Sequence, residues 1–227
     1  MSDYDSLNCF LRATADRYCP KIVREEILIV WRTTTLKMAQ HLISRLAEWR
    51  QSIAEKKVWT FLNDAGVDQD SYSYLELDLC SSGLAEHFLS DKCQLKRGDR
   101  ALLVFFPGLE FMLTLLACFK AGIVAVPVFP PDPRRLKKDL FHFASIQKSS
   151  GAKVALTHKS YSWAKNMAGA ASIFTSSGES WPEMTWIPID STLGEYKALG
   201  GKFSVEEVQG RCKSMERTTE GSDIAFL

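Results

Sequence analysis

The chain has 227 residues, with 28 Lys or Arg against 27 Asp or Glu and a formal net charge of +1. This balance excludes a globally basic protein that would hold nucleic acid by long-range attraction. A content of 46% hydrophobic and 24% charged residues excludes a disordered or fibrous chain. We therefore expect one main globular domain with no nucleic-acid partner.

The cysteines and the apolar stretches indicate a cytoplasmic protein. None of the six cysteines forms a C-x-x-C pair, so reduced thiols are the simplest interpretation. The first residues, MSDYDSLN, are polar and acidic, unlike a secretory signal. The apolar stretch Leu109–Phe129 is interrupted by Glu110 and Lys120, and we predict no membrane span.

The first 57 residues carry weaker signals than the rest of the chain. Apolar residues recur at helical spacing between Leu36 and Ile53, which predicts an amphipathic helix packed on the main body. We expect an N-terminal extension over residues 1–57 and the main domain over residues 58–227.

A helix and a strand follow at the start of the main domain. Ser73 stands three residues before Glu76, a capping box that predicts a helix from Tyr74 to about Ser90. The continuous apolar run ALLVFF, residues 101–106, then predicts a parallel strand covered on both faces.

A strand, helix and strand predict a parallel sheet. Residues 109–121 are apolar nearly all round and end at Gly122, which predicts a buried helix. Residues 123–129, IVAVPVF, predict the next strand, joined to the previous one by a right-handed crossover.

Further elements complete an α/β pattern. Asp132 and Pro133 predict the start of a helix that runs to about Ser149. Residues 153–157 and 184–189 predict a third and a fourth strand. The predicted fold class is α/β, a mostly parallel sheet with covering helices.

The last part of the chain predicts a linker and an unfinished strand. Residues 190–221 are rich in Gly, Ser, Thr and charge, and a second capping box at Ser204 predicts one helix among them. The apolar run from Asp223 to Leu227 predicts the start of a core strand. Because α/β sheets bind ligands beyond the carboxyl ends of their strands, we expect a ligand-binding loop to follow.

Two groups of residues near position 134 are candidate substrate or partner sites. A basic first helical turn adds charge to an already positive helix end, where it would attract phosphate or an acidic partner; the alternative is a solvated charged face. The prolines before it could line a pocket mouth, or simply end the strand. The candidates are Pro130, Pro131, Pro133, Arg134, Arg135, Lys137 and Lys138.

No catalytic or metal-binding motif is complete. The sequence lacks G-x-G-x-x-G, G-x-S-x-G and a full P-loop, and its four histidines lack metal-ligand spacing. We therefore assign no catalytic, cofactor-binding or metal-binding residue.

Several stretches resemble the acyl-adenylate-forming enzymes. SYSYLELD (Ser71–Asp78) resembles the first core motif of that family, and FKAGIVAVPVFPPDP (Phe119–Pro133) resembles the second. The Pro-Pro-x-Pro ending favours the fatty acyl-AMP ligase branch. Segments 58–66, 96–122 and 150–157 resemble the same branch, so the resemblance covers residues 58–227.

The resemblance implies the first lobe of the large domain of an ATP- and magnesium-dependent ligase, incomplete at its C-terminus. Such an enzyme joins a fatty acid to AMP and passes the acyl group to an acyl carrier protein, or to a carrier domain of a polyketide or peptide synthase. In the family, the strand that Asp223–Leu227 resembles leads into the loop that holds the ATP phosphates. We therefore expect this chain alone to be inactive and to bind neither ATP nor magnesium without the remainder of the ligase.

Two alternatives stay open. The chain could be a non-catalytic binding module whose basic residues 134–138 engage an acidic carrier protein or a companion ligase chain. It could also be a flavodoxin-like nucleotide binder that merely shares the sheet architecture.

Overall fold

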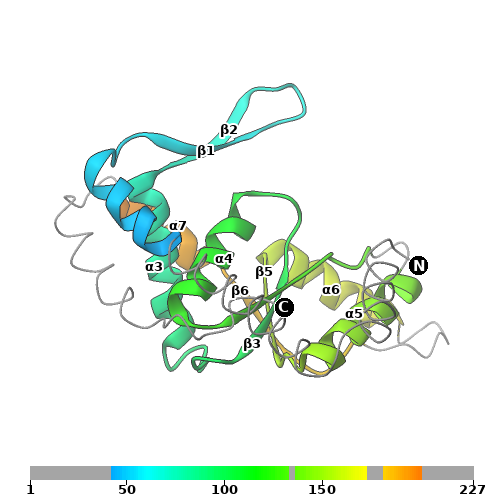
Figure 1. Cartoon of the computed structure of the whole chain (residues 1–227). Coiled ribbons are helices and arrows are strands. Elements are labelled where there is room, and N and C mark those ends of the chain that lie inside the picture. Colours follow the sequence, from blue (N-terminus) through cyan, green and yellow to red (C-terminus); the bar gives the residue numbers. More distant parts are fainter. Residues whose placement is uncertain (1–41, 133–135, 173–180, 201–227) are drawn as a thin grey trace, which may run out of the picture.

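The computed structural model describes residues 42–132, 136–172 and 181–200 (Figure 1). Most of the N-terminal extension, the helix predicted from Ser204 and the strand predicted from Asp223 lie outside these ranges. Their predictions therefore stay untested.

Four parallel strands form the central sheet, in the order β4-β3-β5-β6. They are β3 (Arg100–Val104), β4 (Val124–Val128), β5 (Val154–Thr157) and β6 (Thr185–Pro188). The predicted α/β class is confirmed. The first of these strands is shorter than predicted, because Val104 pairs with the last residues of β4 and β5, and no strand continues beside Phe105 and Phe106.

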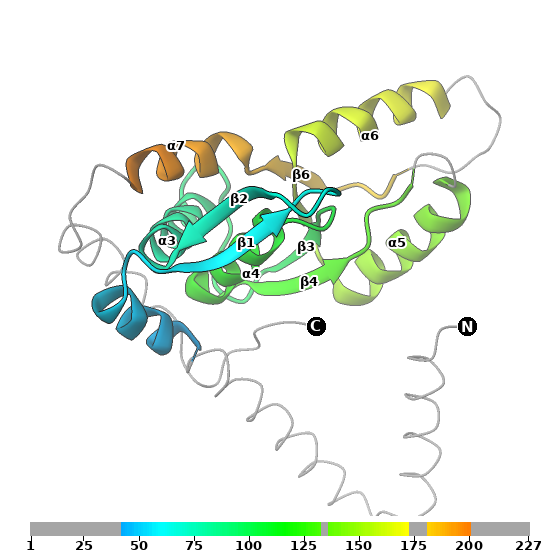
Figure 2. The same cartoon turned by 90° about the horizontal axis from the view of Figure 1, so that it is seen from above.

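Helices cover both faces of this sheet. One face packs against α3 (Tyr74–Leu89), α4 (Leu109–Ala121) and α7 (Asp190–Gly200). The other packs against α5 (Leu136–Ser150) and α6 (Lys159–Ser172) (Figure 2). Alternate residues of β3 divide between the two cores, as the period of a strand requires.

Local signals set the ends of the best-predicted helices. Ser73 Oγ accepts from the backbone N–H of Glu76 at 3.2 Å, and Glu76 Oε2 accepts from the N–H of Ser73 at 2.8 Å, so the capping box is formed. The helix α4 ends at Gly122, whose φ of 68° is left-handed and suits glycine. Both predictions are confirmed.

A β-hairpin that the sequence analysis did not identify precedes α3. Its strands are β1 (Lys57–Leu62) and β2 (Asp68–Ser73), which pair antiparallel and project from the body (Figure 1). The side chain of Asn63 accepts from the N–H groups of Ala65 and Val67, each at 3.0 Å, and so holds the turn.

The first described residues also pack on the main body, as predicted. Residues 42–52 are helical, and Ile43 and Leu46 belong to the larger hydrophobic core. Arg50, from the same helix, is buried and donates to Asp78 of α3. This segment is therefore joined to the α3–α4 layer by both apolar and charged contacts.

Residues 190–200 differ from the linker predicted there, because they form α7. Leu193 of this helix is buried, and the ring of Tyr196 lies against Gly83 of α3. A Cβ atom at Gly83 would lie 2.5 Å from three ring carbons of Tyr196. The missing side chain thus lets the two helices approach closely.

Candidate functional site

The carboxyl ends of the four parallel strands meet at one edge of the sheet, which we call the carboxyl edge. In the parallel register, Val104 pairs with Val128 and Thr157, and Thr157 pairs with Pro188, so all four strands end together. Open α/β sheets bind ligands at this edge. It is therefore the first place to search for a functional site.

Apolar side chains dominate one half of the carboxyl edge. Phe129, directly after β4, is 80% exposed, and Phe106, after β3, is exposed as well. The ring of Phe106 meets the ring of Tyr161 edge to face, with centroids 5.7 Å apart. Such surface can contact an apolar ligand or a further part of a protein.

Tyr161 fixes the segment that follows β4. Its hydroxyl donates to the backbone carbonyl oxygen of Pro131 at 3.1 Å, and the ring is buried at the start of α6. Burial, with a smaller contribution from Asp139, raises the pKa of the Tyr161 phenol well above its usual range. The phenol therefore stays protonated and keeps its role as a donor.

A histidine and a carboxylate lie on the other half of the edge. His158 Nδ1 is 3.9 Å from Asp190 Oδ1, which is longer than a hydrogen bond. Asp190 Oδ2 accepts from the backbone N–H of Lys159 at 2.6 Å, and so caps α6. The rings of His158 and Phe105 meet edge to face, with centroids 4.9 Å apart. Asp190 thus joins the starts of α6 and α7.

The structure places only some of the predicted site residues. Pro130 and Pro131 lie at the carboxyl edge and are buried. Pro133, Arg134 and Arg135 lie outside the described residues. Lys137 and Lys138 belong to the first turn of α5, where only the backbone is described. Their predicted substrate or partner role stays a prediction.

The two motifs that carry the family resemblance meet in the protein interior. Asp78, from the first motif, accepts from Lys120 Nζ, in the second motif, and from Arg50 Nη1. Lys120 Nζ also donates to the backbone oxygen of Asp78 at 3.0 Å and to Ser82 Oγ at 2.8 Å. All three charged side chains are buried. These motif residues therefore hold the lobe together.

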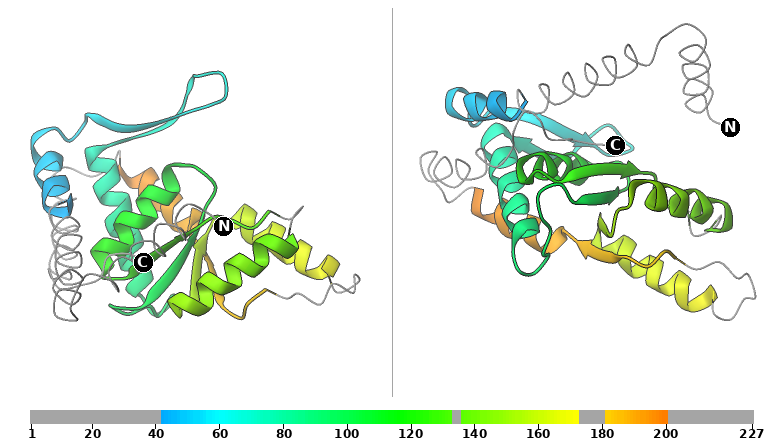
Figure 3. Two further views of the ribbon diagram at one scale, coloured as in Figure 1. Left: turned by 45° about the vertical axis from the view of Figure 1, so that its right-hand side comes forward. Right: turned by 60° about the horizontal axis from the view of Figure 1, so that its bottom comes forward.

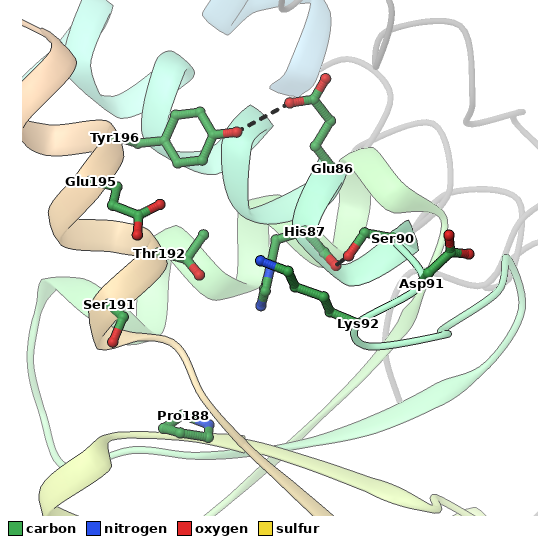
Figure 4. A pocket seen from close by; sticks show the side chains of 10 residues that line it. All are labelled: Glu86, His87, Ser90, Asp91, Lys92, Pro188, Ser191, Thr192, Glu195 and Tyr196. Atoms are coloured by element: carbon green, nitrogen blue, oxygen red, sulfur yellow. Dashed lines mark hydrogen bonds between the residues drawn. The ribbon is translucent and has the colours of Figure 1, made fainter.

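A cavity of about 730 Å³ lies between the end of α3 and the start of α7 (Figure 4). Desolvation and the charge of Lys92 lower the pKa of His87, while Glu195 on the facing helix opposes that shift. Tyr196 donates to Glu86 at 3.2 Å across the same space. The cavity is lined by Glu86, His87, Ser90, Asp91, Lys92, Pro188, Ser191, Thr192, Glu195 and Tyr196.

No three His, Cys, Asp or Glu side chains among the described residues are grouped as a metal site requires. We therefore assign no metal ligand among the described residues, and we derive no step through ATP or a metal. No helix in the described ranges is long and apolar enough to cross a membrane.

The four-stranded parallel sheet and its two helical layers define an α/β protein. A family model described as AMP-binding enzyme matches residues 49–221, about three quarters of the chain. The chain therefore belongs to the AMP-binding enzyme family.

The relatives place the chain near the ligases that act on fatty acids. It is 39% identical over 102 residues to "Medium-chain-fatty-acid--[acyl-carrier-protein] ligase JamA" of Moorena producens, covering 45% of this chain and 17% of that protein. It is 30% identical over 120 residues to a ligase described in the same words, TtuA of Teredinibacter turnerae, covering 53% and 18%. The matches thus span less than a fifth of the length of these relatives.

A solved structure has the same fold. The fatty acyl-adenylate ligase from L. pneumophila, in complex with acyl adenylate and pyrophosphate, matches with a TM-score of 0.57 and 23% identity. The match covers 82% of this chain and 27% of that one. Together the comparisons confirm the predicted resemblance to adenylate-forming enzymes and to their fatty acyl branch.

Proposed function

We propose that this chain forms the first lobe of an ATP-dependent ligase that joins a fatty acid to AMP and then passes the acyl group to a carrier protein. The observation that carries the proposal is the AMP-binding enzyme match over residues 49–221. The names of the two ligases from Moorena producens and Teredinibacter turnerae state a medium-chain fatty acid and an acyl carrier protein, which supports the same two substrates here.

The carboxyl edge supports a role as a wall of the site. Its exposed Phe106 and Phe129 offer apolar surface, and Tyr161 holds the backbone after β4 in place. We expect the reactive groups, and the binding of ATP and magnesium, to come from the remainder of the ligase.

The first experiment is to sequence the native transcript through the codon for Leu227 and to express its full product. We expect that product to catalyse fatty acid-dependent exchange between ATP and pyrophosphate, and to raise the mass of a holo carrier protein by one acyl group. The 227-residue chain alone should give no exchange above a blank without protein. Exchange by the isolated chain would contradict its predicted dependence on the remainder.

A stop codon directly after Leu227 would overturn the ligase proposal for this product. The second candidate would then be the non-catalytic module that binds an acidic carrier protein or a companion ligase chain. One observation favours that module: residues 133–172 carry eight Lys or Arg and one Asp.

A further inference from the structure

Residues 133–172, which include α5 and α6, combine a basic sequence with exposed apolar side chains. Among the basic side chains that the structure describes, Lys148, Lys153 and Lys159 are exposed. Residues 133–172 have a local net charge of +7, although the whole chain has a net charge of only +1. The single acidic residue of this segment is Asp139, which accepts from the backbone N–H of Asp132 at 3.1 Å. The segment is thus a local basic region in a chain whose remaining residues are acidic on balance.

Large apolar side chains stand out from the same two helices. Phe141 of α5 is 72% exposed, and Trp163 and Met167 of α6 are 66% and 56% exposed. Lys159, Trp163 and Met167 are spaced four residues apart and are all exposed, so they form one stripe along α6. We call Phe141 and Lys148 of α5, together with Lys159, Trp163 and Met167 of α6, the α5–α6 face.

Packing of the inner side explains why these residues point outward. Leu140 and Phe143 of α5, and Tyr161 of α6, belong to the core on this side of the sheet. Phe143 stacks on Trp186 of β6 with centroids 5.8 Å apart. Because the inner positions are already filled by these residues, the exposed aromatic and aliphatic groups are additional to the core.

The position of the α5–α6 face connects it with the carboxyl edge. The helix α6 begins two residues after β5 ends, and its Tyr161 touches both Phe106 and the backbone of Pro131. Both views of Figure 3 show α5 and α6 at one end of the molecule, away from residues 42–52. A partner docked on this face would therefore lie close to the edge where α/β sheets bind ligands.

We infer that the α5–α6 face docks an acidic carrier protein, with the lysines steering its approach and Trp163 as the main apolar anchor. Charge complementarity supports this occupant, because a basic face speeds association with acidic proteins and selects against basic ones. Trp and Met are enriched where protein interfaces bury apolar surface. The inference rests on the proposed function for the identity of the partner.

Binding of the 227-residue chain to a holo acyl carrier protein, fluorescently labelled on its phosphopantetheine thiol, tests the inference. Because opposite charges attract less strongly in salt, we expect affinity to fall as salt rises from 50 to 300 mM, on the order of tenfold. The double variant Lys148→Glu and Lys159→Glu should weaken binding at least about tenfold, and Trp163→Ala at least about fivefold.

Matched control variants test whether binding depends on the α5–α6 face itself or on any exposed lysine or apolar side chain. Lys96→Glu reverses an exposed lysine before β3, and Leu62→Ala removes an exposed apolar group from the hairpin. Both controls should stay within about twofold of the unchanged chain. All of these positions are exposed, so the variants should fold, which circular dichroism can confirm.

The other possible results separate a failure of the docking inference from a failure of the proposed function. Equal affinities for the face variants and the controls would place the carrier elsewhere, while leaving the proposed ligase function intact. Binding to vesicles with 30% anionic lipid but not to the carrier would identify a membrane surface, and a dimer that Trp163→Ala dissolves would identify a second copy of the chain. Loss of acyl-adenylate formation by the full transcript product would instead contradict the proposed function itself.

Discussion

Lys120 and Asp78 form a buried ion pair between α4 and α3, and the two residues come from the two motifs that carry the family resemblance. Arg50 completes the group from the helical residues 42–52. A charged group inside a protein is costly to desolvate and is tolerated when its partners satisfy it. These two motif residues therefore have a structural role, because they join α3 to α4.

Removing the shared carboxylate should destabilise the chain strongly. Asp78→Ala leaves Lys120 and Arg50 buried without their common partner, so we expect unfolding free energy to fall by about 3–5 kcal/mol. Urea unfolding followed by circular dichroism measures the change. Glu48→Ala, which breaks the exposed pair with Arg45, should change it by less than about 1 kcal/mol. Similar losses for the two variants would show that the buried network contributes little.

Local signals explain why part of the fold could be predicted. The helix α3 has a complete capping box at Ser73, and α4 is an apolar run that ends at Gly122. The continuous apolar runs of β3 and β4 likewise matched a sheet covered on both faces. These elements are specified by residues that lie next to one another in the sequence.

The elements that were missed depend on more distant contacts. The strand β1 is mostly exposed, and five of the six residues of its partner β2 are Asp, Gln or Ser, so neither shows a clear alternation of apolar and polar residues. The contact of Gly83 with Tyr196 joins two helices that are far apart in the sequence. Only the fold brings such residues together.

The contacts of the candidate site also join residues that are far apart in the sequence. The sequence located Pro130 and Pro131 at the end of a strand, but it did not indicate that Tyr161 would donate to the Pro131 carbonyl from 30 residues away. Lys120, a charged residue in a mostly apolar helix, is the one sequence signal of a buried ion pair. The sequence shows it only as an interruption of an apolar stretch and does not identify Asp78 as its partner.

Because α3 and α7 lie in close contact, the effect of Gly83→Ala on stability should change sign when the ring of Tyr196 is removed. Gly83→Ala places a Cβ against the ring of Tyr196, so the ring must move, and we expect a net loss of about 1 kcal/mol or more. In a Tyr196→Ala background the ring is absent. The same substitution should then stabilise α3 by about 0.5–1 kcal/mol, because alanine favours helix more than glycine does.

Urea unfolding of the four proteins in this cycle measures the coupling. Gly194→Ala in α7 is the matched control, since a Cβ there would meet no atom within 4 Å. Its effect should be the same in both backgrounds. An identical effect of Gly83→Ala with and without Tyr196 would contradict the packing that the structure shows.

Buried thiols should make the folded state less stable at high pH. Burial is the largest cause of the shift and raises the pKa of Cys80 to about 12. A thiol in an unfolded chain has a pKa of roughly 8.5. Below that pH both states are protonated and the thiol does not affect the equilibrium. Above it only the unfolded state loses the proton, so stability falls by about 1.4 kcal/mol per pH unit for this group up to about pH 12.

Unfolding measured from pH 7 to pH 10 in the presence of a reductant tests this dependence. Cys80→Ala should reduce the slope above pH 9 by about one proton, whatever its effect at pH 7. Cys93→Ala should reduce the slope less. Cys93 is only partly buried, and the charge of Lys92 opposes the rise in pKa that burial causes. A slope that is unchanged in Cys80→Ala would show that this thiol ionises in the folded chain.

Two Tyr→Phe substitutions separate the buried hydrogen bond at the carboxyl edge from an exposed one. Tyr161→Phe leaves the carbonyl of the buried Pro131 without its donor, so we expect a loss of about 1–3 kcal/mol. Tyr196→Phe removes the hydroxyl that donates to the exposed Glu86. Water can replace that bond, and the loss should stay below about 0.5 kcal/mol.

The same pair of variants also tests the link between this edge and function. If Tyr161 positions the segment after β4, Tyr161→Phe in the full transcript product should raise the KM for fatty acid several-fold, which corresponds to about 1 kcal/mol. The change in kcat should be smaller. Tyr196→Phe should leave both parameters unchanged. Equal stability and equal kinetics for the two variants would mean that the hydroxyl of Tyr161 does not fix the backbone at the carboxyl edge.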